Sequence, residues 1–301
     1  MAKQTLSDAF RQYYDLTKPR VVFLLVFTAI VGMLLAVPGW PPISQIVWAS
    51  LGIGLAAASG AVMNQIIDMR QDAIMARTQN RPLATGGLRV WQAVVFGAAL
   101  CAVAMIILEV KVNRLTAILT FLSMVGYGVI YTVYLKPATP QNIVIGGAAG
   151  ASPPLLGWVA MTGSVSAEAC LLFLIIFVWT PPHFWALALY RREEYAQAGV
   201  PMLPVTHGEE FTRLQILLYS YILVAVTLMP FSIHMMGGLY LAAAVYLNLR
   251  FMQLVIALYR EYSDALSRKT FVYSIKYLMY LFAWMLIDHY CWNVLLSLIS
   301  N

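Results

Sequence analysis

The sequence predicts an all-α, polytopic membrane protein with about nine transmembrane helices. Of its 301 residues, 61% are hydrophobic and 11% are charged, and the mean hydropathy is +0.76. A soluble domain of this size carries about 25% charged residues. The charged fraction is too small to cover a water-facing surface, so most of the exterior is expected to meet lipid.

The apolar stretches give the number of expected helices. A helix needs about 20 mainly apolar residues to cross the hydrocarbon core of a bilayer. Because the first twenty residues lack the features of a signal or transit peptide, the first span is expected to stay in the protein. The eighth span is interrupted by Asn248, Arg250 and Gln253. The nine expected spans are 21–38, 44–66, 91–110, 115–135, 141–161, 168–190, 214–236, 238–258 and 275–299.

The positive charges predict how the helices are oriented. Of the 19 Lys and Arg, Lys111 and Arg114 fall on one side and Arg250 lies within a span, which leaves sixteen on the other side. Positive residues accumulate on the cytoplasmic side of membrane proteins. We therefore expect a cytoplasmic N-terminus and an external C-terminus in a bacterial-type cytoplasmic (inner) membrane. The net charge of +6 reflects this topology and does not predict nucleic-acid binding.

Two long polar loops suggest a repeat inside a single domain, residues 1–301. The loops at about 67–90 and 190–213 follow the second and the sixth helix, four spans apart. Duplicated helical units are common in membrane proteins. The expected repeat relates helices two to four to helices six to eight.

The first polar cluster stands at the end of the second expected helix. Asn64, Asp68 and Asp72 are spaced four residues apart, so they share one helical face. Charges near the membrane usually face an interior cavity, and Mg²⁺ is held by one or two carboxylates together with waters and phosphates. Arg77 and Arg81 follow, and guanidinium groups match phosphate oxygens. The cluster predicts a metal-diphosphate site; simple pairing of the aspartates with nearby arginines is the alternative.

A second cluster ends the sixth expected helix. Pro181 and Pro182 are expected to kink or locally open the helix, because proline lacks a backbone donor. Broken helices are tolerated at membrane depth where they line an enclosed cavity. His183 is therefore expected to face a pocket, although an ordinary satisfied histidine is an equal alternative. Tyr190 and Glu194 follow at four-residue spacing.

The fourth and fifth expected helices add a third group. Tyr131 and Lys136 stand at the end of the fourth helix. A lysine there can neutralise a departing diphosphate, and tyrosine rings can face a cation; interfacial anchoring is the alternative. The fifth helix begins near Asn142 and carries the small residues 146–152, which predict close helix packing; room for a bulky ligand is the alternative.

These motifs resemble those of the UbiA-type intramembrane prenyltransferases. The family's first motif is N-D-x-x-D-x-x-x-D, and Gln65 stands here where its first aspartate falls. The stretch P-H-F-W…E-Y-x-x-A-G-V-P-M-L-P resembles the heme-directed branch of the family. The resemblance implies transfer of a farnesyl group from farnesyl diphosphate to a vinyl group of protoheme IX (heme B), giving heme O.

The resemblance also implies roles for residues of this chain. The expected cofactor is Mg²⁺, held by Asn64, Asp68, Asp72 and Glu194. The expected partners are farnesyl diphosphate, heme B and the lipid bilayer, with proteins of heme biosynthesis or oxidase assembly as further candidates. The other expected site residues are Asp68, Asp72, Lys136, Tyr131 and Glu194 for catalysis, Arg77, Arg81 and Lys136 for diphosphate, and His183, Trp185 and Tyr190 for heme.

Two alternatives stay open at this point. A UbiA-type enzyme for an aromatic or chlorin acceptor shares the first motif, but a fuller second aspartate motif is expected in it. A secondary transporter also combines broken helices with repeats. The transporter is disfavoured because the polar residues gather at one membrane face instead of near the midplane.

Overall fold

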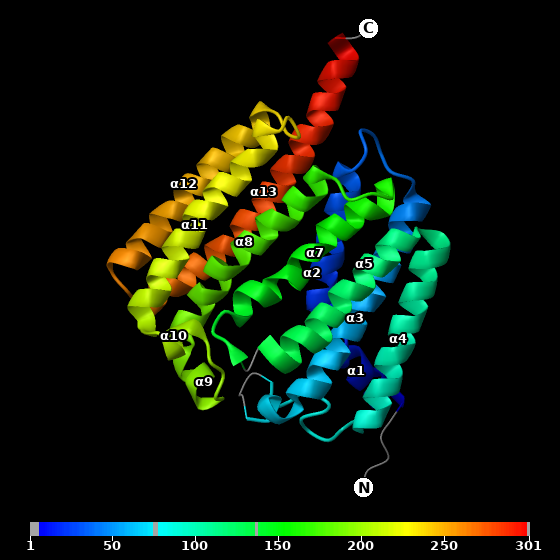
Figure 1. Ribbon diagram of the computed structural model, residues 1–301, viewed down its shortest axis with the longest axis vertical. Helices are drawn as coiled ribbons and strands as arrows, with labels where there is room; N and C mark the ends of the chain where they lie inside the picture. The colour runs from blue at the N-terminus through cyan, green and yellow to red at the C-terminus, as the bar shows by residue number, and fades with distance from the viewer. Residues whose placement is uncertain (1–5, 75–77, 136–137, 300–301) are drawn as a thin grey trace.

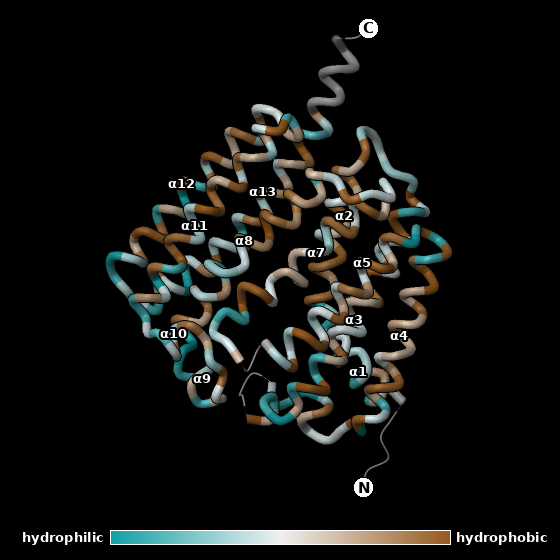
Figure 2. Tube along the Cα trace, viewed as in Figure 1, coloured by the Kyte–Doolittle hydropathy of each residue, from teal (hydrophilic) through white to brown (hydrophobic). Residues whose placement is uncertain are grey.

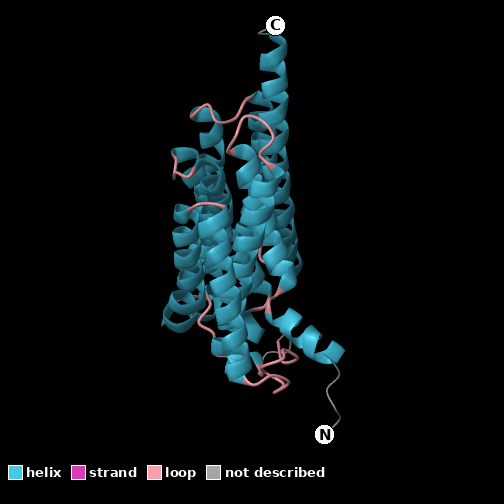
Figure 3. Ribbon diagram, turned by 90° about the vertical axis from the view of Figure 1, so that its right-hand side faces the viewer, coloured by secondary structure: helices cyan, strands magenta, loops and turns pink. Residues whose placement is uncertain are grey.

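The computed structural model describes residues 6–74, 78–135 and 138–299, and these ranges contain helices and no strand. The long helices run side by side in one bundle, and the two ends of the chain lie at opposite ends of that bundle (Figures 1 and 3). The predicted all-α architecture is therefore confirmed.

Ten long elements build the bundle, and three short helices lie at its polar end. The short ones are α1 (Leu6–Leu16), α9 (Arg192–Gln197) and α10 (Leu203–Thr206). The long ones are α2 (Pro19–Leu35), α3 (Ile43–Asp72), α4 (Val90–Lys111), α5 (Arg114–Val125), the π-helix η1 (Gly126–Leu135), α7 (Asn142–Thr162), α8 (Ala167–Tyr190), α11 (Gly208–Ser232), α12 (Gly238–Arg260) and α13 (Asp264–Ile299).

The number of membrane spans agrees with the prediction. In the described residues, eight spans are long and apolar enough to cross a bilayer, and α5 with η1 counts as one of them. A ninth span arises if α1 and α2, which meet at an angle of 48°, are taken as one bent helix. The chain is thus an integral, multi-pass membrane protein.

The polar connections gather at one end of the bundle. Helices α1, α9 and α10 and the connection from α3 to α4 lie together at the end where the chain begins, and hydrophilic residues concentrate there (Figures 1 and 2). Helix α3 was expected to end near residue 66, but it continues to Asp72. Its last turns therefore extend into this polar end.

Small residues let two helices of the bundle approach closely. A Cβ atom added to Gly32 of α2 would lie 2.0 Å from the carbonyl oxygen of Pro154. One added to Gly157 of α7 would lie 1.9 Å from the carbonyl oxygen of Ala29. Neither distance leaves room for a side chain, so glycine sets the contact between α2 and α7, as is common in membranes.

The proline pair in α8 does not open the helix, so that part of the expectation was wrong. Helix α8 is continuous from Ala167 to Tyr190 with Pro181 and Pro182 inside it. Prolines remove two backbone donors, but the regular turns on both sides continue. Directly before the pair, the Thr180 hydroxyl donates to the carbonyl oxygen of Ile176, one turn earlier, at 2.7 Å.

Packing explains one of the residues that interrupt the eighth expected span. Asn248 is buried in α12, where its amide nitrogen donates to Thr227 Oγ1 at 3.0 Å. Its amide oxygen accepts a hydrogen bond from Tyr277 Oη at 2.6 Å. Asn248 therefore joins α11, α12 and α13, because a buried amide is stable only when it is hydrogen-bonded.

Candidate active site

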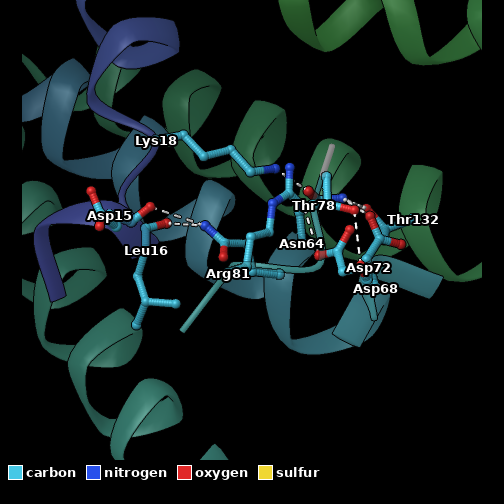
Figure 4. Close-up of polar contacts among 10 residues, drawn as sticks. Asp15, Leu16, Lys18, Asn64, Asp68, Asp72, Thr78, Arg81 and Thr132 are labelled. Atoms are coloured by element: carbon cyan, nitrogen blue, oxygen red, sulfur yellow. Dashed lines mark hydrogen bonds and ion pairs between the residues drawn. The ribbon is translucent and has the colours of Figure 1, made fainter. Parts of the chain in front are cut away.

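The first polar cluster lies on the last three turns of α3 (Figure 4). Asn64, Asp68 and Asp72 are 4%, 7% and 5% exposed. Because α3 stays helical to Asp72, the four-residue spacing keeps the three side chains on one face. An amide and two carboxylates are thus held out of bulk solvent.

Asn64 connects this face to two other elements. Its Nδ2 donates to Asp68 Oδ2 at 3.0 Å and to Thr132 Oγ1 of η1 at 3.2 Å. Its Oδ1 accepts a hydrogen bond from Lys18 Nζ. Lys18 stands between α1 and α2 in the left-handed backbone region, with φ 50°. This uncommon conformation belongs to the bend that brings the ammonium group to the cluster.

Gln65 stabilises the same bend between α1 and α2 through the end of α1. The side chain is 1% exposed, and its Nε2 donates to the carbonyl oxygens of Asp15 at 3.2 Å and Leu16 at 2.9 Å. The resemblance marked Gln65 only as a departure from the family's aspartate. In the structure its amide supplies donors, which a carboxylate lacks, and it fixes the end of α1 against α3.

Arg81 closes the other side of the cluster. Its Nη1 donates to Asp72 Oδ2 at 2.6 Å, a charge-assisted hydrogen bond and ion pair. The Thr78 hydroxyl donates to the Asp72 carbonyl oxygen at 3.1 Å, which anchors the connection that carries Arg81. The pairing left open as an alternative is therefore present for Arg81. Arg77 lies outside the described residues.

The π-helix η1 places two tyrosine rings beside the cluster. The rings of Tyr127 and Tyr131 stack with centroids 5.7 Å apart and planes 8° apart. Thr132 Oγ1 donates to the Tyr127 carbonyl oxygen at 2.8 Å. A Cβ atom added to Gly146 would lie 2.3 Å from the Tyr131 ring, so this glycine makes room for it. A regular helix was expected here; π-helical turns are frequent at functional sites.

Lys136 lies outside the described residues, directly after η1.

The second cluster is arranged differently. His183 is buried in α8, and its Nδ1 lies 2.7 Å from Ser274 Oγ of α13. Its ring stacks on Trp179, with centroids 4.2 Å apart, and on Phe271, with centroids 4.6 Å apart. Sequence reasoning missed these contacts, because α13 has an ordinary apolar composition and carries no motif.

The remaining residues of the second cluster point in separate directions. Trp185 is 0% exposed and meets the Tyr219 ring of α11 edge-on at 5.3 Å, so it lies in the core between α8 and α11. Tyr190 ends α8, whereas Glu194 belongs to α9. Glu194 Oε2 lies 3.8 Å from Arg191 Nη1. Tyr190 and Glu194 therefore do not share the face of one helix.

The donor set on α3 fits a hard divalent cation. Asn64, Asp68 and Asp72 offer oxygen atoms only, and Mg²⁺ takes one or two carboxylates while it keeps waters and phosphate oxygens as further ligands. Among the described residues, no three His, Cys, Asp or Glu side chains gather closely enough to hold a metal. Glu194 is therefore not brought to Asp68 and Asp72 as a third carboxylate.

Comparison with known proteins gives a family match across most of the chain. A model of the UbiA prenyltransferase family matches residues 25–286. A protoheme IX farnesyltransferase of Leptothrix cholodnii is 58% identical over 293 residues, 96% of each chain. One of Thiobacillus denitrificans is 60% identical over 280 residues, 93% of this chain and 94% of its own.

Solved structures share the fold at low sequence identity. A digeranylgeranylglyceryl phosphate synthase superimposes with a TM-score of 0.81 at 18% identity, over 93% of this chain and 98% of its own. A UbiA homologue from Archaeoglobus fulgidus, bound to DMAPP and Mg²⁺, gives a TM-score of 0.64 at 16% identity, over 91% and 99%. These matches show the same helical architecture.

Proposed function

The chain belongs to the UbiA prenyltransferase family and is a prenyltransferase, and from this premise we propose that it transfers the farnesyl group of farnesyl diphosphate to a vinyl group of heme B, giving heme O. The observation that carries the proposal is the set of relatives named protoheme IX farnesyltransferase. They are 54–60% identical to this chain over 93–96% of its length.

In this proposal, Asn64, Asp68 and Asp72 hold Mg²⁺ together with the diphosphate. When bound at these residues, Mg²⁺ would supply positive charge against the diphosphate leaving group. Arg81, fixed by Asp72 at 2.6 Å, places its remaining donors beside the phosphate oxygens. Arg77 and Lys136 are proposed as further diphosphate contacts. Preorganised positive charge of this kind acts where negative charge develops as the C–O bond breaks.

The stacked tyrosines are proposed to shelter the farnesyl cation. The C–O bond of the donor breaks, and diphosphate leaves with the bonding electron pair. Aromatic faces attract a cation, and Tyr131 and Tyr127 lie next to Asn64 through Thr132. The vinyl carbon of heme B then attacks the farnesyl carbon, and water adds to the porphyrin side and releases a proton, which leaves a hydroxyl group.

The second cluster is proposed to serve the heme acceptor. His183 is held in one orientation by Ser274 and two aromatic rings, as suits a group that orients heme iron. Tyr190 lies at the end of the same helix. Glu194 is proposed to position water or a second ion, with Arg191 holding its carboxylate. Trp185 supports this face from the core.

The proposed location is a bacterial cytoplasmic membrane with the N-terminus inside and the C-terminus outside. Sixteen Lys and Arg on one side against two on the other support this orientation. The two polar clusters would then face the cytoplasm. Proteins of heme biosynthesis or oxidase assembly are proposed as further partners.

The test is turnover by the purified protein. The protein in detergent is incubated with heme B, farnesyl diphosphate and Mg²⁺, and heme O is measured by mass spectrometry. We expect product that disappears with a chelator and returns with added Mg²⁺. A folded protein that binds heme B but forms no heme O would overturn the proposed acceptor, and aromatic acceptors would be tested next.

A further inference from the structure

A basic groove runs between α12 and α13, and the residues of the two polar clusters do not line it. Its volume is about 520 Å³. None of the residues of α3, η1 or α8 described above takes part in it. The groove is lined by Arg250, Gln253, Leu254, Ala265, Arg268, Lys269, Val272, Tyr273 and Lys276.

All the charged residues that line the groove are positively charged. Arg250, Arg268, Lys269 and Lys276 are exposed, and the lining includes no carboxylate. In the described part of the chain, none of these four residues forms an ion pair with an acid. Arg250 Nη1 donates to Gln253 Oε1 at 3.1 Å, a neutral partner on the next turn. The four positive charges are therefore available to an anion from outside the protein.

The backbone positions of two of the four cations, Arg250 and Lys276, lie far from the helix ends that are joined between α12 and α13. Arg250 precedes the end of α12 at Arg260 by ten residues, and Lys276 follows the start of α13 at Asp264 by twelve. At about 1.5 Å per residue these separations are about 15 and 18 Å. A charge within the hydrocarbon region is costly, and long side chains reduce the cost by extending toward the headgroups.

The surroundings of the groove are apolar. Leu254 and Val272 line it, and Leu249, Ile275 and Met279 lie exposed nearby on the same helices. Exposed apolar side chains on a membrane span meet acyl chains. The groove thus offers cations next to an apolar border on two helices that are apolar enough to span the bilayer.

We propose that this groove binds the phosphate headgroup of an anionic phospholipid. Basic pockets between transmembrane helices on the cytoplasmic side suit anionic headgroups. Charge complementarity and the position beside the acyl chains favour a lipid over a free anion. The phosphate neutralises Arg250 and Lys276, which explains how an otherwise apolar span accommodates them. The site is independent of the proposed reaction.

The test measures which lipids the protein retains. The purified protein is exchanged into mixed micelles that contain phosphatidylglycerol and phosphatidylcholine, and bound lipid is counted by native mass spectrometry. Two double variants are compared with the natural chain, Arg250→Gln/Lys276→Gln and Arg268→Gln/Lys269→Gln. The control, Lys111→Gln/Arg114→Gln, also removes two positive charges, but at the connection between α4 and α5. All four changed groove residues are exposed, and thermal unfolding verifies that each variant is folded.

We expect the natural chain and the control to retain phosphatidylglycerol in preference to phosphatidylcholine. Each lost charge weakens attraction to an anionic lipid by about 1 kcal/mol, which is about fivefold, so each double variant should retain less lipid by at least fivefold. Equal retention by the groove variants and the natural chain would overturn the proposal. Displacement of the lipid by millimolar inorganic phosphate would also overturn it and indicate a free-anion site.

Discussion

The two polar clusters of this protein have similar spacing in the sequence but are held in different ways. The cluster on α3 is buried and is joined to three other parts of the chain by Lys18, Thr132 and Arg81. In the cluster on α8 and α9, Glu194 is half-exposed and paired with its neighbour Arg191. His183, the buried member of this second cluster, is hydrogen-bonded to Ser274 of α13.

Helix length causes this difference. Helix α3 continues for six residues beyond its expected end at residue 66, so Asp68 and Asp72 remain on the face of Asn64. Helix α8 stops at Tyr190, where Arg191 leaves the helical region with φ −116° and ψ 18°. Four-residue spacing creates a shared face only within one continuous helix. The comparison therefore predicts that the α3 cluster carries the metal chemistry and that the second cluster assists.

The largest effect is expected at the α3 carboxylates. Asp68→Asn and Asp72→Asn each remove a carboxylate charge from the proposed metal site, and we expect heme O formation to fall by about 100-fold to 1,000-fold, as when preorganised charge stabilisation is lost. Glu194→Gln should lower it by less than about tenfold. The measurement is the initial rate of heme O formation by the purified variants.

The matched control for these variants is Glu109→Gln, an exposed carboxylate 4.0 Å from Arg114 at the other end of the bundle. It should leave the rate unchanged. If Glu194→Gln were as damaging as Asp68→Asn, the two clusters would act as one metal site, contrary to the separation seen here.

A smaller but still large effect is expected at Arg81. Arg81→Gln removes the partner of Asp72 and the proposed diphosphate contact, and we expect kcat/KM for farnesyl diphosphate to fall by about 100-fold. Arg81→Lys keeps the positive charge but loses the bidentate hydrogen-bonding geometry of the guanidinium group, so it should recover only part of the activity. Arg191→Lys, the corresponding change in the second cluster, should cost less than threefold. Full activity in Arg81→Lys would show that a point charge suffices.

Much of the fold followed from composition and hydrophobic length alone. The nine expected spans match the helices because the cost of exposing backbone groups to lipid leaves few alternatives to helices of that length. The shared face of Asn64, Asp68 and Asp72 was also predictable, because four-residue spacing gives a common face on any continuous helix. The interruption at Asn248 did not prevent a correct eighth span, because the amide is bonded inside the bundle.

What could not be predicted depends on contacts between segments distant in sequence. The partners of Gln65 lie 49 and 50 residues away, and Ser274 lies 91 residues from His183. The π-helical turn of η1 and the continuity of α8 through two prolines arise from packing, which periodicity does not encode.

A moderate effect is expected from filling the space beside Tyr131. In Gly146→Ala the new methyl group would lie 2.3 Å from the ring, so the ring or the helix must move. Overpacking of this kind typically costs about 1–3 kcal/mol, and a displaced Tyr131 should also lower the rate. Gly150→Ala is the control, because an added Cβ there would face open space and not a neighbouring side chain or helix. Thermal unfolding and heme O formation are measured for both. Equal behaviour of the two variants would show that Tyr131 tolerates another position.

The smallest effect is expected at Ser274, and it decides what the second cluster does. Ser274→Ala removes the partner of His183 Nδ1, which should lower the free energy of unfolding by about 1 kcal/mol. Ser232→Ala is the control, since that exposed hydroxyl bonds only to Leu228 in its own helix. If His183 orients heme, Ser274→Ala should also raise the KM for heme B while the KM for farnesyl diphosphate stays constant. A loss of stability with both KM values unchanged would make His183 a packing residue between α8 and α13, and the acceptor site would have to be sought elsewhere in the bundle.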